Sequence, residues 1–162
     1  WINRILSWEP NARIVLHGVS MGAATVLMVS GEDLPGNVKA VIADCGYTSE
    51  WDEFQREADA LHIPWFPVLN ATSVLSKIRD GYDFKQASAL AQVKKSRIPT
   101  LFIHGSSDEL VPYSMLGELY AAAACEKEEL TVEGAGHALS SSVAPTLYWR
   151  TVEDFIAKYL DR

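Results

Sequence analysis

The sequence is poor in cysteine, with Cys45 and Cys125 the only two among its 162 residues. Two cysteines so far apart exclude a disulfide framework, and no group of His, Cys, Asp or Glu has the spacing of a metal site. We expect both thiols to be buried in the fold, as free cysteines commonly are. We expect no metal and no bound cofactor.

Long apolar runs and an excess of basic charge are also missing. No stretch reaches the roughly 20 consecutive apolar residues that a membrane-spanning helix needs. Fourteen lysines and arginines against 21 acidic residues give a net charge of −7, which is not the charge of a surface that binds nucleic acid or anionic lipid. We therefore expect no nucleic-acid partner and no membrane segment in this chain.

The composition that remains is typical of a globular protein. Hydrophobic residues make up 48% of the chain and charged residues 22%, which excludes disordered and fibrous classes. The length fits one domain. The chain begins at Trp1 rather than at a methionine, and it carries no signal-peptide pattern. This start predicts a piece of a longer protein, or the product of a cut.

Short β-branched runs alternate along the chain with stretches of helical spacing. The expected strands cover 13–17, 38–43, 99–104 and 129–133, and the expected helices cover 2–8, 21–29, 112–124 and 145–160. This alternation predicts an α/β fold, a three-layer sandwich with a parallel sheet between helices. The near-continuous apolar character of the first three strands agrees with burial on both faces. Gly31 is expected to follow the helix over 21–29 as its C′ residue.

The segment 46–96 interrupts this alternation, because it contains no good strand pattern. Ser49 and Asp52 resemble a capping box in which Asp replaces Glu, and helical spacing follows them. A second helical stretch comes further along the segment. We therefore expect a core made of 1–45 and 97–162, with a helical cap or lid inserted between its strands.

Aromatic residues of the insertion allow two interpretations. They form a lid over the site, or they pack the cap helices onto the sheet. These residues are Trp51, Phe54, Trp65 and Phe66. An apolar lid would exclude water and favour acyl groups over strongly charged substrates.

The strongest chemical signal is a G-x-S-x-G motif, Gly18-Val19-Ser20-Met21-Gly22. It follows an apolar strand and precedes an apolar helical stretch, which is the setting of a nucleophile elbow. In so tight a turn, a Cβ at either glycine is expected to clash with backbone. The turn would lift the Ser20 hydroxyl above the sheet and bring the Met21 N–H, at a helix N-terminus, to a developing oxyanion. The alternative is a glycine-rich turn with a passive serine.

A serine nucleophile needs a base, and the base needs a carboxylate that orients it. Asp108 follows the third expected strand, and His137 follows the fourth within Gly134-Ala135-Gly136-His137. Catalytic groups of open parallel sheets gather at the carboxyl ends of the strands, where Ser20 also lies. The chain order Ser, Asp, His is that of α/β-hydrolase triads.

These motifs together resemble the C-terminal part of α/β-hydrolases of the serine esterase, lipase and aminopeptidase-like superfamily. Besides the G-x-S-x-G motif, the matching segments are 104–112, 134–137 and 43–49, the last being similar to bacterial members with a small helical cap. The resemblance covers essentially the whole chain. It implies Ser20 as nucleophile, His137 as general base and Asp108 as its orienting acid. The Met21 amide would be one oxyanion donor.

The sheet of that superfamily has eight strands, whereas the sequence shows only the last four. The front half would hold the loop that supplies the second oxyanion donor. The strand over 14–17 should therefore have an open edge, which is an aggregation liability. We expect a separate polypeptide, such as the other product of a proteolytic cut, to pair there.

Two other carboxylates compete with Asp108 for the role of orienting acid. Asp44 also ends a strand, although a polar turn residue is the commoner interpretation of such a position. Glu109 neighbours Asp108 and is the weaker candidate, because the resemblance places the acid at Asp108.

Other polar residues at strand ends are interpreted as structural. His17 and His104 each precede a glycine, where histidines are more often structural or pocket-lining than catalytic. Ser106 and Ser107 are expected to shape their turn through side-chain hydrogen bonds to backbone.

The features together predict a serine hydrolase that cleaves carboxylic esters through an acyl-enzyme, with a small-molecule acyl compound as substrate. A peptidase or thioesterase of the same fold is the nearest alternative. A non-catalytic binding protein of this fold is another. The presence of all three triad residue types favours an enzyme over a binding protein.

Overall fold

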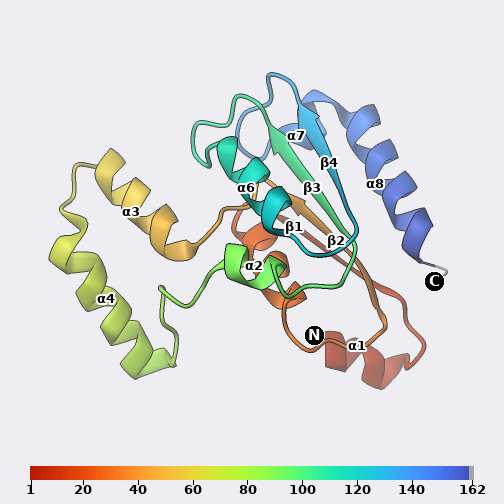
Figure 1. The fold of residues 1–162 in the computed structure, drawn as a ribbon, viewed down its shortest axis with the longest axis horizontal. Helices are drawn as coiled ribbons and strands as arrows, with labels where there is room; N and C mark the ends of the chain where they lie inside the picture. The colour runs from red at the N-terminus through yellow and green to blue at the C-terminus, as the bar shows by residue number, and fades with distance from the viewer. Residues whose placement is uncertain (161–162) are drawn as a thin grey trace.

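A four-stranded parallel sheet between helices forms the body of the chain in the computed structural model, which describes residues 1–160 (Figure 1). The predicted core segment 97–162 therefore ends outside the described residues. The strands are β1 (Ile14–Val19), β2 (Val38–Asp44), β3 (Thr100–Gly105) and β4 (Lys127–Val132), in the order β1-β2-β3-β4. All neighbouring strands pair in parallel. The predicted α/β class and its four strands are confirmed.

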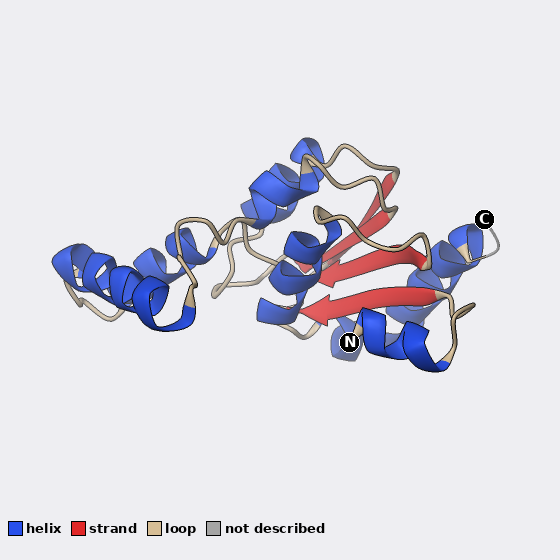
Figure 2. Cartoon of the chain, turned by 90° about the horizontal axis from the view of Figure 1, so that it is seen from below, coloured by secondary structure: helices blue, strands red, loops and turns tan. Residues whose placement is uncertain are grey.

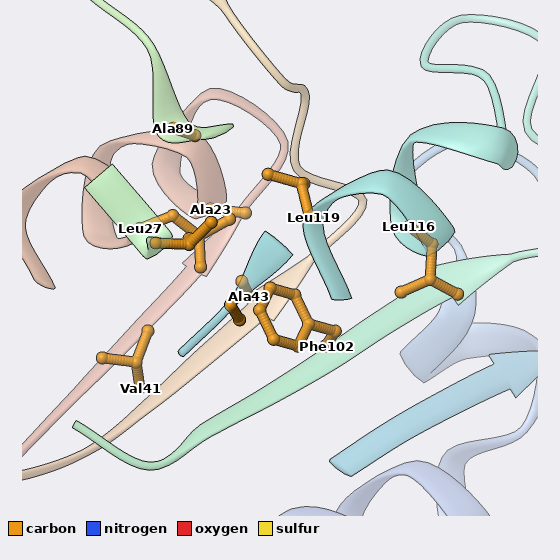
Figure 3. Close-up of a cluster of buried hydrophobic side chains, with 10 residues drawn as sticks. Ala23, Leu27, Val41, Ala43, Ala89, Phe102, Leu116 and Leu119 are labelled. Carbon is orange, nitrogen blue, oxygen red and sulfur yellow. The ribbon is translucent and has the colours of Figure 1, made fainter. Parts of the chain in front are cut away.

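One face of the sheet packs against three helices, α2 (Met21–Ser30), α5 (Ala89–Val93) and α6 (Ser114–Ala122). Phe102 of β3 lies among side chains of β2, α2 and α6 in this layer of the core (Figure 3). Successive side chains of a strand point to opposite faces. Val41 and Ala43 of β2 accordingly pack here.

The other face packs against the long C-terminal helix α8 (Pro145–Tyr159). Ala40 and Ile42 of β2 point to this side, with Leu101 and Ile103 of β3. The helix buries a stripe at the spacing expected from the sequence, made of Tyr148, Val152, Phe155 and Tyr159, with Ile156 partly buried. Both faces of the sheet are thus buried, as the near-continuous apolar strands predict.

Three short helices lie outside these long elements. The N-terminal α1 (Ile2–Trp8) agrees with the expected helix, whereas α5 and α7 (Ser140–Val143) carry no sequence signal. The C′ interpretation of Gly31 is wrong, because its φ of −88° is right-handed. Glycine is needed there for space: a Cβ would lie 2.6 Å from the Gln92 carbonyl oxygen.

The predicted insertion 46–96 contains α5, which packs on the sheet, and two further helices, α3 (Glu50–Ala60) and α4 (Trp65–Asp80), which lie to one side of the sheet (Figure 2). The N-terminus of α3 is capped by Ser49, whose Oγ accepts from the Asp52 N–H at 3.1 Å. The Asp52 carboxylate accepts from that hydroxyl at 2.6 Å, so the capping box is only half formed. None of the helices within residues 1–160 is long and apolar enough to cross a membrane.

The edges of the described sheet are β1 and β4. Beside β1 lies an apolar groove of about 550 Å³, lined by residues of α1, β1 and α2 and of the turn that follows α2. Leu16, Val26 and Val29 are among these residues. Apolar side chains therefore border the open side of β1.

Candidate active site

The three predicted catalytic side chains meet at one edge of the sheet. Ser20 follows β1, Asp108 follows β3 and His137 follows β4. Because parallel strands place their carboxyl ends on the same edge, the fold itself brings these distant residues together. Ser20 and His137 are half-buried, and Asp108 is buried.

Ser20 sits in a strained turn between β1 and α2. Its φ of 56° and ψ of −118° lie where residues with a Cβ are rarely found. A Cβ at Gly18 would lie 2.1 Å from the carbonyl oxygen of Gly22, so this turn requires glycine at position 18. The expected clash at Gly22 is wrong, because a Cβ there meets no described atom within 4 Å.

His137 bonds to both of the other residues. Its Nε2 lies 2.8 Å from Ser20 Oγ, and its Nδ1 lies 2.9 Å from Asp108 Oδ2. A carboxylate only accepts, so we assign the hydrogen of the neutral ring to Nδ1. Nε2 is then the acceptor for the Ser20 hydroxyl, as a general base must be.

The Asp108 carboxylate is held by its own loop. Oδ1 accepts from the backbone N–H of Leu110 at 3.0 Å and of Val111 at 2.9 Å. These bonds fix the carboxylate while Oδ2 faces His137. The Asp108 side chain is fully buried. Asp108, the hydrogen-bond partner of His137, is therefore held in one orientation.

The loops that carry Asp108 and His137 are joined directly to each other. A Cβ at Gly105 would lie 2.3 Å from the Ala135 carbonyl oxygen, so the two loops pack at backbone distance. The Ser107 N–H donates to that same oxygen at 3.0 Å. Ser106 Oγ accepts from the Gly134 N–H at 2.9 Å. We expected Ser106 to bond within its own turn. It bonds instead to the neighbouring loop.

Met21 is the first residue of α2, beside Ser20. The N–H groups of a first helical turn have no acceptor within the helix, and the positive end of the helix dipole lies there. This placement agrees with the oxyanion role predicted for the Met21 amide, which stays a prediction.

Asp44 lies at the end of β2 and contacts the site. Among the hydrogen bonds of the described residues, none joins Asp44 to His137. The Asp44 carbonyl accepts the Ser20 N–H at 2.8 Å, and its Oδ1 accepts from Ser140 Oγ at 3.1 Å. Burial raises the pKa of Asp44, against the opposing effect of hydrogen bonds from Ser140 and Tyr148. The geometry places Asp108, rather than Asp44 or the exposed Glu109, beside the imidazole.

Cys45 lies against the same residues. One ligand atom each of Cys45, Asp108 and His137 lie within 4.8 Å of one another, a proximity that the sequence spacing does not indicate. Burial raises the pKa of the Cys45 thiol to about 12, and a metal ligand must be the thiolate. Asp108 and His137 already use their facing atoms for each other. We therefore assign this cluster to the hydrogen-bonded site and not to a metal.

Two residues of α3 reach the site without any signal in the sequence. Arg56 pairs with Glu53 at 3.3 Å and donates to the Leu110 carbonyl oxygen of the Asp108 loop. Burial raises the pKa of Glu53, whose carboxylate also interacts electrostatically with His137 and Asp108. In sequence both residues belong to a charged, solvated helix face, so only the fold reveals their proximity.

The aromatic residues considered as a lid make contacts within the insertion. Lys85 Nζ lies 4.4 Å from the centre of the Trp51 ring, and Phe54 packs edge to face against Phe84 at 5.0 Å. Trp65 and Phe66 pack against each other at 6.3 Å. Their role as a lid over Ser20 stays a prediction, as does the division of the chain into a core and a cap.

Comparison with known protein sequences gives matches along the chain. The model of the prolyl oligopeptidase family matches residues 7–162. The uncharacterized protein YqkD of Bacillus subtilis is 31% identical over 161 residues, which are 96% of this chain and 53% of that protein. The α/β-hydrolase domain-containing protein WAV2 of Arabidopsis thaliana is 30% identical over 155 residues, 91% of this chain and 48% of WAV2. The chain thus spans about half the length of these relatives.

Solved structures share the fold. An acylaminoacyl peptidase of Pyrococcus horikoshii matches 99% of this chain and 27% of its own, with a TM-score of 0.71 and 18% identity. The esterase domain of a Rhodothermus marinus protein matches 97% of this chain and 65% of its own, with a TM-score of 0.67 and 21% identity. Since the family model covers almost every residue, the chain belongs to the prolyl oligopeptidase family, within the α/β-hydrolase fold.

Proposed function

We propose that this chain carries the catalytic centre of a serine hydrolase that cleaves carboxylic esters, with Ser20, His137 and Asp108 as its triad. The observation that carries the proposal is the pair of hydrogen bonds on His137, 2.8 Å to Ser20 and 2.9 Å to Asp108. A nucleophile within reach of a base, and a base held by a third group, is the arrangement that activates a serine. The family membership supports the same conclusion.

The reaction begins when Ser20 Oγ attacks the ester carbonyl carbon and its proton moves to Nε2 of His137. Asp108 stabilises the imidazolium that forms. When the tetrahedral intermediate collapses, His137 gives the proton to the departing alkoxide, which leaves as an alcohol. Water then attacks the acyl group on Ser20, with His137 accepting a proton and returning it to Ser20 as the carboxylic acid departs.

The Met21 N–H is the oxyanion donor that this chain supplies. We propose that a further polypeptide segment pairs with the open edge of β1 and brings the second donor. The apolar groove beside β1 and the half-length match to the relatives support this. The loss of one oxyanion donor costs roughly 10²–10³ in rate, so the chain without that segment should react slowly rather than not at all.

A peptide or other amide is the second candidate substrate, because the matching family is named for an oligopeptidase. An amide nitrogen must be protonated before it leaves, whereas an alkoxide departs more readily, so esters demand less of His137. A p-nitrophenyl ester and a p-nitroanilide of the same acyl group separate the two. Turnover of the ester alone supports an esterase, and Ser20-dependent turnover of both supports a peptidase.

Covalent labelling with a fluorophosphonate probe tests the serine hydrolase itself, in the complete native polypeptide. The intact mass should rise by one adduct in the wild-type protein and in the control Ser142→Ala, which removes an exposed serine of α7. Ser20→Ala should not be labelled. Labelling that survives Ser20→Ala, or a wild-type protein that does not react, contradicts the proposal.

A further inference from the structure

His104 lies beside the Asp108 carboxylate, and the proposed reaction does not use it. It belongs to the end of β3, and its side chain is 1% exposed. Nε2 lies 3.1 Å from the Val111 carbonyl oxygen and 3.3 Å from Asp108 Oδ2. Both neighbours are acceptors, so Nε2 must carry a hydrogen that lies between them.

The two acceptors of His104 are themselves connected. Val111 accepts from His104 through its carbonyl and donates through its N–H to Asp108 Oδ1 at 2.9 Å. His104, Val111 and Asp108 thus form a closed ring of contacts, anchored on a buried strand. The oxygen that faces His104, Oδ2, is the one that accepts from His137 Nδ1 at 2.9 Å.

We propose that His104 is a positioning residue of the triad, which fixes the acid loop through Val111 and holds the Oδ2 oxygen that orients His137. The inference rests on the proposed function and extends it by one residue. The rival explanation is packing alone, since the His104 ring also lies edge to face with Tyr113 at 5.9 Å. Packing alone would not make the chemistry of His137 sensitive to the hydrogen on His104.

A hydrogen beside Oδ2 withdraws charge from the carboxylate and restricts its rotation. Without it, Asp108 turns more freely, and its less compensated charge stabilises protonated His137. Removing the donor should slow proton transfer from Ser20, because a carboxylate that turns freely orients the His137 base less well. It should also move the acid limb of the pH–rate profile to higher pH, because His137 stays protonated longer as the pH rises.

Other charged or titratable groups face these residues from neighbouring elements. Glu53 of α3 interacts electrostatically with His137 and Asp108. Cys45 interacts electrostatically with Asp108, and Asp44 interacts electrostatically with His104. All three stay unchanged when only position 104 is substituted, so a shift of the profile reports on His104.

The test compares two amides at position 104 in the complete native polypeptide. His104→Gln places an amide N–H about where Nε2 lies, whereas His104→Asn is too short to reach. The readout is the rate of fluorophosphonate labelling at Ser20 across the range where histidine titrates, about pH 5–8. We expect H104Q to stay within about threefold of wild type, and H104N to be about tenfold slower with its acid limb at higher pH.

His17→Asn is the matched control, because His17 lies on β1 and bonds to the Tyr148 hydroxyl at 3.0 Å rather than to Asp108. Its acid limb should stay at the wild-type position. His104→Met, without a donor, supplies the same comparison with H104Q if H104N does not fold by circular dichroism. The role of His104 is overturned if a variant without the donor keeps the wild-type profile, or if it is slower without a shift of the acid limb. Either outcome leaves the proposed function standing. A wild-type protein that is never labelled at Ser20 overturns the proposed function and this inference with it.

Discussion

The carboxyl-end edge of the sheet, where the strands end, and the α3–α4 segment place their side chains in opposite surroundings. At the edge, the charged Asp108 and the polar His104 are buried among hydrogen-bond partners. On α4, the apolar Leu75 and Ile78 are 62% and 79% exposed, while the polar Ser73 is buried. The edge is therefore held by the strands beneath it, whereas the helical segment has little core of its own.

This difference indicates which part of the molecule positions the three candidate catalytic residues. The side chains of Asp108 and His137 bond to each other, to Ser20 and to the loop after β3, and His104 of β3 lies 3.3 Å from Asp108 Oδ2. The helical segment reaches this loop through Arg56 and the Leu110 carbonyl. A change in the segment should thus alter access and loop order more than the geometry of the triad.

Core packing should show the largest contrast between the two regions. Phe155 of α8 is 0% exposed, so Phe155→Ala should lower the free energy of unfolding by about 3–5 kcal/mol. Ile78→Ala on α4 should change it by less than about 0.5 kcal/mol. Urea denaturation measures both. Similar losses in the two variants would mean that the α4 surface is covered in the native protein.

The tight turn at Ser20 should give the next largest effect. Gly18→Ala places a Cβ 2.1 Å from the Gly22 carbonyl oxygen, which should cost about 1–3 kcal/mol and displace Ser20. Gly22→Ala adds a Cβ in open space at the start of α2, where alanine favours the helix by up to about 1 kcal/mol. Thermal denaturation distinguishes them. Equal destabilisation by the two substitutions would contradict the geometry of the turn.

The pH dependence of stability should reveal the buried Asp44. Burial raises its pKa in the folded state above the ordinary value of 3.8, so the folded state binds this proton more tightly than the unfolded state. Stability is then lost as the pH rises from 3.8 through the raised pKa. Asp44→Asn removes that loss, so its free energy of unfolding minus the wild-type value should increase across this window. A pH-independent difference would refute the assignment.

The smallest effect should come from the contact between the two regions. Arg56→Ala removes the hydrogen bond to Leu110 and the ion pair with Glu53, and should change global stability by only about 1 kcal/mol. Proteolytic cleavage within 46–96 should nevertheless become faster. Arg79→Ala is the control, because the ion pair described for Arg79, at 3.8 Å from Asp80, is exposed and lies within α4. Equal cleavage of both variants would show that Arg56 does not tether the segment.

The order of strands and main helices could be predicted because each leaves a local pattern. The run 99–104 has an apolar, partly β-branched centre at 101–103, and α8 repeats its buried residues at helical spacing. The helix α5 could not be found, since its five residues are too few to show a period. Gly31 was misinterpreted because its reason is the approach of Gln92, which is distant in sequence.

The candidate site was predictable to the extent that strand ends meet at one edge. Ser20, Asp108 and His137 each follow a recognisable strand, and parallel topology does the rest. His104 was interpreted only as structural or pocket-lining and Arg56 was not considered, because each bonds to a backbone carbonyl of the loop after β3, that of Val111 for His104 and that of Leu110 for Arg56. Such contacts depend on loop conformation, and no residue type at those positions signals them.

Ser20, His137 and Asp108 are held to act as one unit, and a cycle of substitutions tests this most directly. The rate of fluorophosphonate labelling at Ser20 would be measured for His137→Ala, Asp108→Asn and the double variant in the complete native polypeptide. Asp108→Asn should slow labelling by up to about 10⁴, and the double variant should be no slower than His137→Ala alone, because Asp108 acts through the imidazole. Losses that multiply in the double variant, or an Asp108→Asn variant that reacts at the wild-type rate, would contradict the account.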